Sequence, residues 1–466
     1  MFHSWSEFTV LADATEPLAA RSASARVGRT RFSAGASGPH LTVICIVAGL
    51  MLAVGFGGDL TSSLSGVGGV AWRLGCIILI IFAWVMHADI AKGREFTALF
   101  LPWLICCIIE AAIRTMSSGG TDYVADVFRQ IFIVATGASV YAIAHVRAQR
   151  SRLRLVMFAA SCLTTILSAI VAYSLVKNGW SYEAIRATKN VVIEKTGFGA
   201  NLACFAGLIA ALAAYDPARR SKTIVMGLII FLVLLSVLLT ARAPVALLVV
   251  GALVAWGATR MAWLRRKSFK AGFIGSSIVL ALIVGSFFTS IDWIAHSDIA
   301  KELAGRAALW QIGLSGWKGN QLLGTGLRTF HDVIATNLGA GTYTTAYERN
   351  SLYALESGAF HNIWVTTLGE RGAIGLLGLY LTFSLLFARM IGNLKALTKH
   401  ERFFAILTLS FLFLRGFVEI AGLMSYSDGA VDAIVVVAIA LLIAPSGDGQ
   451  SGGRRSVSRG ATKSRS

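Results

Sequence analysis

The chain of 466 residues is 56% apolar and only 14% charged, with a formal net charge of +18. Charge-free stretches such as residues 224–239 exclude an ordinary soluble domain, because a soluble surface needs more charged side chains than this composition supplies. Since a transmembrane helix needs about 20 residues, we expect an all-α polytopic membrane protein with about 12 transmembrane helices in one domain.

The two ends of the chain are basic and poor in apolar residues. Residues 1–40 carry their arginines among Ser, Ala and Gly, without the apolar run of a signal peptide. Residues 445–466 have the same character. We expect both to be disordered cytoplasmic tails beside anionic lipid, flanking a transmembrane domain of residues 41–444.

Within that domain the apolar residues fall into a series of runs, each a candidate for a helix. The runs are residues 41–57, 70–86, 96–113, 124–145, 155–176, 198–215, 224–239, 244–258, 273–293, 361–388, 403–421 and 430–443. Several are shorter than about 20 residues, so we expect some helices to be tilted or partly re-entrant.

The basic residues of the connecting loops predict the orientation. With the N-terminus inside, every inner loop is basic, as at residues 147–154, 219–222, 260–270 and 389–402, and with the tails these loops hold most of the 42 Lys and Arg. The positive-inside rule therefore explains the net charge, and no basic stretch has the interleaved aromatics of a nucleic-acid binder. We expect a membrane protein with membrane lipids as partners and no nucleic acid.

This topology places three segments on the outer side: residues 177–197, a short turn around Arg242, and a long loop of residues 294–360 between the ninth and tenth helices. Loops longer than about 15 residues are usually functional or disordered. Apolar residues at helical spacing over 303–312 and a glycine turn at 323–326 predict that this loop is ordered. The turn lacks the flanking pattern of a nucleotide-binding loop, which favours a simple turn over a phosphate cradle.

His361 stands where the long loop ends and an apolar helix begins. A histidine side chain, with an ordinary pKa of roughly 6.5, can accept a proton from a hydroxyl at neutral pH. His361 is therefore the candidate general base for chemistry on a membrane-anchored substrate. The alternative is that it caps an interfacial helix for which Trp364 is the aromatic anchor.

Four short motifs follow one another along this part of the chain. They are Thr-Ala-Arg-Ala at 240–243, Gly305-Arg306 with Leu309-Trp310, Leu-Gly-Thr-Gly at 323–326 with Phe330, and His361-Asn362 with Glu370, Gly372 and Gly375. In these motifs and their order the chain resembles the superfamily of O-antigen ligases and Wzy-type polysaccharide polymerases, over roughly residues 198–388. The first motif departs from the family's Thr-x-Ser-Arg-Gly pattern, with Ala241 and Ala243 in place of Ser and Gly.

The resemblance implies a GT-C-like helical bundle of the bacterial inner membrane, with its active site facing the periplasm. It also implies that this bundle transfers a glycan from an undecaprenyl diphosphate carrier to an acceptor hydroxyl. The acceptor is a growing glycan in a polymerase and the lipopolysaccharide core in a ligase. By the same resemblance Arg242, Arg306 and His361 match functional positions of the family. We expect the two arginines to bind the diphosphate and His361 to act as base, with Arg328 and Glu370 as accessory candidates.

These residue types suit the reaction on chemical grounds. Departure of a lipid diphosphate builds up negative charge, which fixed cations in a dry site can stabilise. A guanidinium pairs with two phosphate oxygens and stays charged at any relevant pH. Asp-x-Asp occurs nowhere in the chain, and the outer pair Asp428 and Asp432 has no histidine beside it. We therefore expect an arginine-based site with no metal and no cofactor.

Several alternatives stay open on the sequence alone. The arginines named above, together with Arg349, could be interfacial or solvated charges. Arg415 and Glu419, at i,i+4 spacing within run 403–421, could neutralise each other or form a functional pair. About twelve helices are also common in transporters and flippases built from repeated halves, although the long outer loop has no counterpart in the first half. The six cysteines lie in apolar runs, which favours buried inert thiols over a disulfide or zinc framework.

Overall fold

The computed structural model describes residues 39–60, 65–86, 88–118, 122–145, 147–177, 227–231, 242–297, 306–327, 360–418 and 429–444, with a few isolated positions between them. Residues 1–43 and residues 44–466 form two separate units, and the contacts below belong to the second. The predicted tails at 1–40 and 445–466 lie almost completely outside the described residues.

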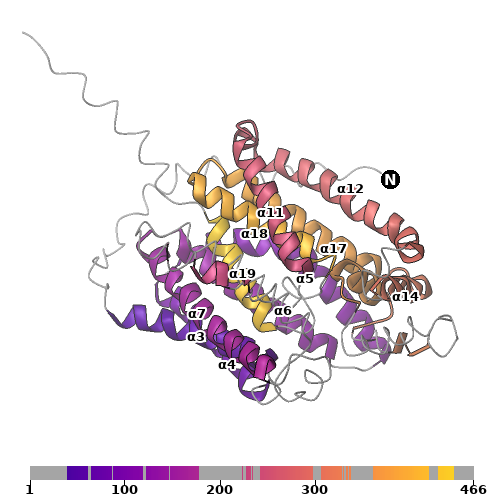
Figure 1. The fold of residues 1–466 in the computed structure, drawn as a ribbon, viewed down its shortest axis with the longest axis horizontal. Coiled ribbons are helices and arrows are strands. Elements are labelled where there is room, and N and C mark those ends of the chain that lie inside the picture. Colours follow the sequence, from indigo (N-terminus) through magenta and orange to yellow (C-terminus); the bar gives the residue numbers. More distant parts are fainter. Residues whose placement is uncertain are drawn as a thin grey trace, which may run out of the picture. The chain divides into compact units, whose positions relative to one another are not determined.

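Every regular element in the described part of the chain is a helix, as the composition predicts (Figure 1). The helices are α3 (Pro39–Leu60), α4 (Ser65–Val85), α5 (Ile90–Ser118), α6 (Asp122–Ala144), α7 (Arg147–Lys177), α11 (Arg242–Arg260), η3 (Leu264–Arg266), α12 (Phe269–His296), α14 (Arg306–Gly319), α17 (Ile363–Asn393), α18 (Lys399–Arg415) and α19 (Gly429–Ile443). The predicted all-helical class is therefore confirmed for these ranges.

The predicted apolar runs fall on these helices, except for 198–215 and most of 224–239, which lie outside the described residues. Among the described residues, four stretches are long and apolar enough to cross a membrane: Ile90–Met116, Asp122–Ala144, Phe269–His296 and Ile363–Asn393. Shorter apolar segments occur in α3, α4, α11 and α19. The number of about twelve spans stays a prediction.

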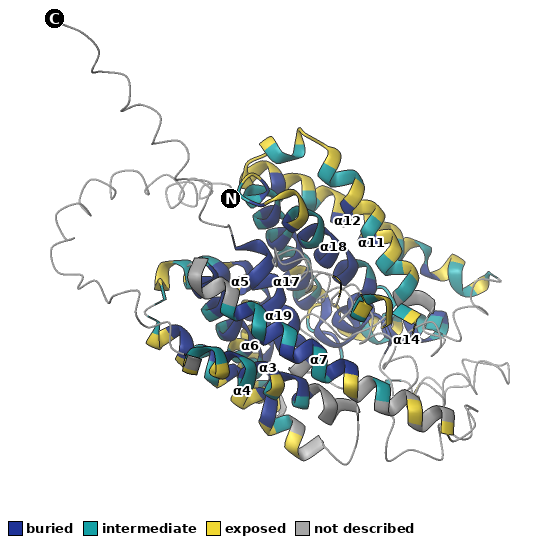
Figure 2. Ribbon diagram, turned by 60° about the vertical axis from the view of Figure 1, so that its left-hand side comes forward, coloured by how far each residue is buried: buried dark blue, intermediate teal, exposed yellow. Residues whose placement is uncertain are grey.

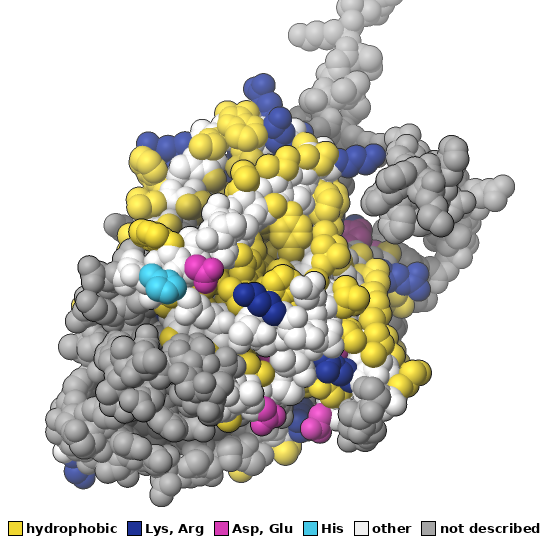
Figure 3. Space-filling view, turned by 90° about the vertical axis from the view of Figure 1, so that its right-hand side faces the viewer, with side chains coloured by type: hydrophobic (Ala, Val, Ile, Leu, Met, Phe, Trp, Pro, Cys, Tyr) yellow, Lys and Arg dark blue, Asp and Glu magenta, His cyan; other side chains and the backbone are white. Residues whose placement is uncertain are grey.

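The outward faces of several helices are apolar, which is the reverse of a soluble protein. On α12, Ile274, Leu282 and Trp293 are 61%, 65% and 63% exposed, whereas Leu280 and Ile291 are buried. Figure 2 shows long exposed surfaces on α11 and α12. Figure 3 shows hydrophobic side chains gathered mainly in the upper and right-hand parts of one face, with charged side chains scattered among them. Contact with lipid fits such a surface better than contact with water.

Helix α17 is central to the described bundle, because α5, α12, α14 and α18 all pack against it. It runs antiparallel to α12: Gly272 lies at Ile391, and Ser276 Oγ donates a hydrogen bond of 3.1 Å to the carbonyl oxygen of Ser384. Glycine permits this approach, since a Cβ at position 272 would lie 3.2 Å from Ile391. The start of α17 therefore lies beside the end of α12.

Two predicted helices are broken or ended at a glycine. Helix α17 is interrupted at Gly372, whose φ of 66° and ψ of −163° are not helical. Helix α18 ends at Arg415, and residues 416–418 form a turn, whereas the apolar run predicts a helix that continues through Glu419, which itself lies outside the described residues. The physical reason is a close contact: the carbonyl oxygen of Gly416 accepts the N–H of Ile363 at 2.8 Å, and a Cβ on Gly416 would lie 2.6 Å from Ile363 Cγ2.

Candidate functional site

His361 has an unusual backbone conformation for a residue other than glycine. Its φ is 47°, and among the described non-glycine residues it alone has a positive φ. The residue is only 4% exposed. Such a conformation costs roughly 1 to 3 kcal/mol and persists only where the surroundings hold it, commonly at functional sites. This strain distinguishes His361 from an ordinary residue before a helix.

Neighbours on both sides hold this conformation. Before His361, the carbonyl oxygen of Phe360 accepts a hydrogen bond of 3.1 Å from Trp310 Nε1. After it, Asn362 Oδ1 accepts from two N–H groups in the first turn of α17, at 2.9 and 3.0 Å, as a helix cap does. Asn362 Nδ2 also donates to the carbonyl oxygen of Phe417 at 2.9 Å. His361 is therefore fixed between α14, α17 and the chain that follows α18.

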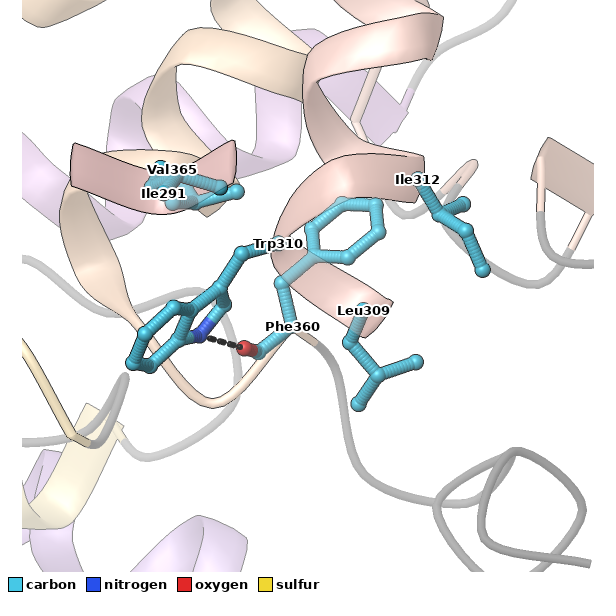
Figure 4. Close-up of a cluster of buried hydrophobic side chains, with 6 residues drawn as sticks. All are labelled: Ile291, Leu309, Trp310, Ile312, Phe360 and Val365. Atoms are coloured by element: carbon cyan, nitrogen blue, oxygen red, sulfur yellow. Dashed lines mark hydrogen bonds between the residues drawn. The ribbon is translucent and has the colours of Figure 1, made fainter. Parts of the chain in front are cut away.

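Trp310 belongs to a buried apolar cluster that attaches α14 to the bundle (Figure 4). The cluster consists of Ile291 on α12, Leu309, Trp310 and Ile312 on α14, Phe360, and Val365 on α17. Phe287 packs edge-on against Trp310, with ring centroids 5.2 Å apart. The helix that apolar spacing predicts in the long loop is therefore present as α14, and its apolar face anchors it.

Arg306 is the first residue of α14 and is half-buried. Residues four apart on a helix lie on the same face, so Arg306 lies one turn before Trp310 on the side that contacts Phe360. The structure thus brings Arg306 and His361 to the same end of the bundle.

Arg242 begins α11, and the direction of α11 places its backbone at that end as well. Gly251 of α11 packs against Leu407 of α18, since a Cβ atom on Gly251 would lie 3.3 Å from Leu407 Cδ1. Further along, Arg265 acts electrostatically on Arg402, near the start of α18. The two helices therefore run antiparallel, and α11 begins level with the end of α18. The prediction for the Arg242 side chain falls outside the described residues.

The break in α17 at Gly372 is filled by the glycine turn of the long loop. In a continuous helix each carbonyl oxygen bonds to the N–H four residues later, but here two carbonyl oxygens and two N–H groups bond to the loop instead. The four hydrogen bonds are Thr325 N to Gly369 O at 2.8 Å, Gly326 N to Glu370 O at 2.9 Å, Ala373 N to Gln321 O at 2.9 Å and Ile374 N to Leu322 O at 3.3 Å. The loop backbone therefore replaces the missing turn, and these four groups stay paired inside the bundle.

The N–H groups of this turn are occupied by protein acceptors. Leu323 N donates to Asn320 Oδ1, Gly324 N to Asn320 O, and Leu327 N to Tyr123 Oη, in addition to the two bonds from Thr325 and Gly326. A phosphate cradle needs N–H groups that point at the ligand. The structure therefore agrees with the prediction of a turn rather than a phosphate cradle.

Glu370 is 2% exposed and lies in the last turn before the break. Its carbonyl oxygen is one of the two that accept from the loop. Glu370 and His361 thus lie at opposite ends of one short helical segment. Arg328, the other accessory candidate, lies outside the described residues, as does Arg349.

A buried set of charged residues behind the break was not expected from the sequence. Arg371 is 3% exposed and pairs with Glu110 of α5, with 2.7 Å between Nη1 and Oε2, and with Asp126 of α6. Asp126 also pairs with Arg129 at 2.6 Å. The sequence feature that could have indicated these residues is the presence of charged side chains inside or beside apolar runs. Such charges are costly in a membrane and are commonly functional.

Arg114, one turn after Glu110 on α5, binds the glycine turn directly. Its Nη2 donates to the carbonyl oxygens of Leu323 and Gly324, at 2.8 and 2.6 Å. The end of α5 therefore holds the loop, through Arg114. The end of α5 and the start of α6 together hold α17 beside the break, through the pairing of Arg371 with Glu110 and Asp126.

Among the described residues, no group of three or more His, Cys, Asp and Glu side chains could hold a metal ion. Free thiols are present at Cys45, Cys76, Cys106, Cys107 and Cys162, of which Cys106 and Cys162 are half-buried and the others buried. Cys204 and Asp428 lie outside the described residues.

The sequence matches no protein-family model and no curated protein. Residue-level geometry therefore has to support any assignment of function.

Proposed function

We propose that the chain is a metal-independent glycosyltransferase of the bacterial inner membrane. It transfers a glycan from an undecaprenyl diphosphate-linked donor to an acceptor hydroxyl at the periplasmic face. The product is a longer O-antigen or exopolysaccharide if the acceptor is a glycan, and a ligated lipopolysaccharide if the acceptor is a lipid core. The observation that carries the proposal is that His361, Arg306 and the start of α11 lie toward the same end of the bundle.

In this reaction the acceptor oxygen forms a bond to the anomeric carbon of the donor sugar. The bond from that carbon to the diphosphate oxygen breaks, and both of its electrons leave with the diphosphate. The acceptor proton passes to the imidazole of His361. Arg242 and Arg306 stabilise the negative charge on undecaprenyl diphosphate as it leaves.

The surroundings of His361 support the role of a base. A base works best when its position is set before the substrate arrives, because the reaction then requires little reorganisation. Trp310 and Asn362 fix the backbone on either side of His361, and the residue is withdrawn from bulk solvent. A residue that only capped the start of a helix would not require a strained backbone.

The test uses purified protein in lipid and the lipid-linked oligosaccharide that accumulates in cells lacking the gene. Transfer is measured as release of undecaprenyl diphosphate, in excess chelator. We expect activity under these conditions, and His361→Ala to slow transfer on the order of 10²- to 10⁴-fold. His400→Ala is the matched control, since His400 is exposed in the first turn of α18.

Two results would contradict the mechanism. Loss of activity with chelator and recovery with magnesium or manganese would overturn the arginine-based account. Full activity of folded His361→Ala protein would mean that the base lies elsewhere.

The role of Arg306 has its own variant. Arg306→Lys keeps the charge but cannot pair with two oxygens at once, so we expect a rate loss on the order of 10²- to 10³-fold. Arg266→Lys, at an exposed position in η3, should be neutral.

A transporter or flippase of lipid-linked saccharides is the second candidate. The break in α17 favours it, because interrupted helices form the substrate sites of many secondary transporters. Reconstituted vesicles separate the two functions. Movement of a labelled lipid-linked saccharide across the bilayer without release of undecaprenyl diphosphate would favour the transporter.

A further inference from the structure

The first segment of α17, residues 363–371, connects His361 with the buried charged residues around Arg371. It begins two residues after His361, following the N-cap Asn362, and ends at Arg371, just before the break at Gly372. Every residue of the segment is buried. Its length is about 13 Å at 1.5 Å per residue, so a rotation or shift at its end moves its start as well.

Arg371 is held from several sides. Its guanidinium pairs with Glu110 and with Asp126, and Nη1 also donates to Cys107 Sγ at 3.0 Å. Its Cζ lies 5.0 Å from the ring centroid of Trp103. Because a guanidinium is planar and its donors point in fixed directions, two carboxylates on different helices define one orientation of the side chain.

Stability alone does not explain this arrangement. The desolvation of buried carboxylates and guanidinium groups can exceed the attraction between them, and apolar residues of the same volume often hold helices together equally well. What distinguishes the pairing is that its hydrogen bonds have fixed directions. They therefore hold α17 at one position along α5 and α6.

We infer that Arg371 is a positioning residue for the transfer reaction. Its pairing with Glu110 and Asp126 fixes the segment 363–371 against α5 and α6, and the segment in turn holds His361 where the acceptor hydroxyl is deprotonated. This inference rests on the proposed function, because it assigns Arg371 to the base which that reaction uses.

The same helix provides a matched control. Arg389 of α17 also bridges α5 and α6, by pairing with Glu95 and donating to Tyr141 Oη at 2.7 and 3.1 Å. It lies beyond the break, toward the other end of α17. Arg389→Lys therefore makes the same chemical change between the same three helices without touching the segment that carries His361.

The experiment measures single-turnover release of undecaprenyl diphosphate and affinity for the lipid-linked oligosaccharide. Arg371→Lys, Asp126→Asn and Arg389→Lys are each made in the wild-type chain and in His361→Ala. In the wild-type chain we expect Arg371→Lys to slow release by about 10²-fold, as for a small displacement of a catalytic group. Donor affinity should stay within about twofold, and Arg389→Lys should be nearly neutral.

In the His361→Ala chain the Arg371→Lys change should cost less than about twofold, because the group it positions is already gone. A general structural defect would instead slow both chains equally. Asp126→Asn removes one charge from the same pairing while keeping the side-chain shape, and should follow the pattern of Arg371→Lys.

Equal losses in both chains, or a full rate in Arg371→Lys, would overturn the positioning role. So would failure of both Arg371→Lys and Asp126→Asn to accumulate as folded protein, since the pairing would then serve folding. Failure of the proposed function is recognised separately: the wild-type chain releases no undecaprenyl diphosphate, or His361→Ala retains the full rate.

Discussion

Trp310 Nε1 and the carbonyl oxygen of Phe360 lie 3.1 Å apart, in a buried hydrogen bond between residues 50 positions apart in the chain. The bond joins α14 to the residue immediately before His361. It therefore connects the helix that begins with Arg306 to the strained backbone of the candidate base.

Replacing Trp310 by Phe should destabilise the protein by about 1 to 3 kcal/mol. Phenylalanine keeps much of the apolar contact but leaves the buried Phe360 carbonyl oxygen without its donor. Thermal unfolding in detergent measures the loss. Trp317→Phe is the control, because the Trp317 Nε1 bond of 2.9 Å to Gln321 O is at an exposed site and should contribute little. Equal stability of the two variants would show that the buried bond does not constrain the site.

Glycine at position 361 should be more stable than alanine there, by roughly 1 kcal/mol. Glycine adopts a positive φ without strain, and this gain exceeds its greater freedom in the unfolded chain. Unfolding of His361→Gly and His361→Ala, both inactive in transfer, measures the difference. At His400, in a helical turn, the order should reverse by up to about 1 kcal/mol. If alanine is the more stable at both positions, the backbone at His361 is not strained.

Gly372→Ala should destabilise the protein by about 2 kcal/mol or more. A Cβ at this position would overlap the carbonyl oxygen of Leu322, and φ is 66°. Gly275→Ala on α12 is the control, since its Cβ would meet nothing within 4 Å, and it should be neutral or slightly stabilising. Unfolding of both variants in detergent tests the docking of the loop at the break. A neutral Gly372→Ala would mean that the loop does not close it.

The basic loops predict the orientation of the whole chain. Reporter fusions after Arg154, Arg220 and Arg266 should give a cytoplasmic signal, and a fusion near Ala340 should give a periplasmic one. A cytoplasmic signal at Ala340 would place His361 on the wrong side of the membrane for the proposed reaction.

The sequence predicts the elements of this site better than their connections. The apolar composition is enough to predict the helices, and the spacing of apolar residues around Trp310 is enough to predict α14. Both predictions depend only on residues that are close together in the chain. The pairing of Arg371 with Asp126 spans 245 positions, and no local pattern contains it. The end of α18 is likewise set by the contact of Gly416 with Ile363, so the apolar run 403–421 predicts too long a helix.

The exchange of backbone partners at Gly372 also implies an order of assembly. Within a bilayer, a lone helix must satisfy its own N–H and carbonyl groups. We therefore expect α17, one of the four candidate membrane spans among the described residues, to insert as a continuous helix. The break can form only when the loop arrives with its two N–H groups and two carbonyl oxygens. On this account we expect the geometry around His361 to form after insertion, and α17 to become a straight helix if the loop detaches.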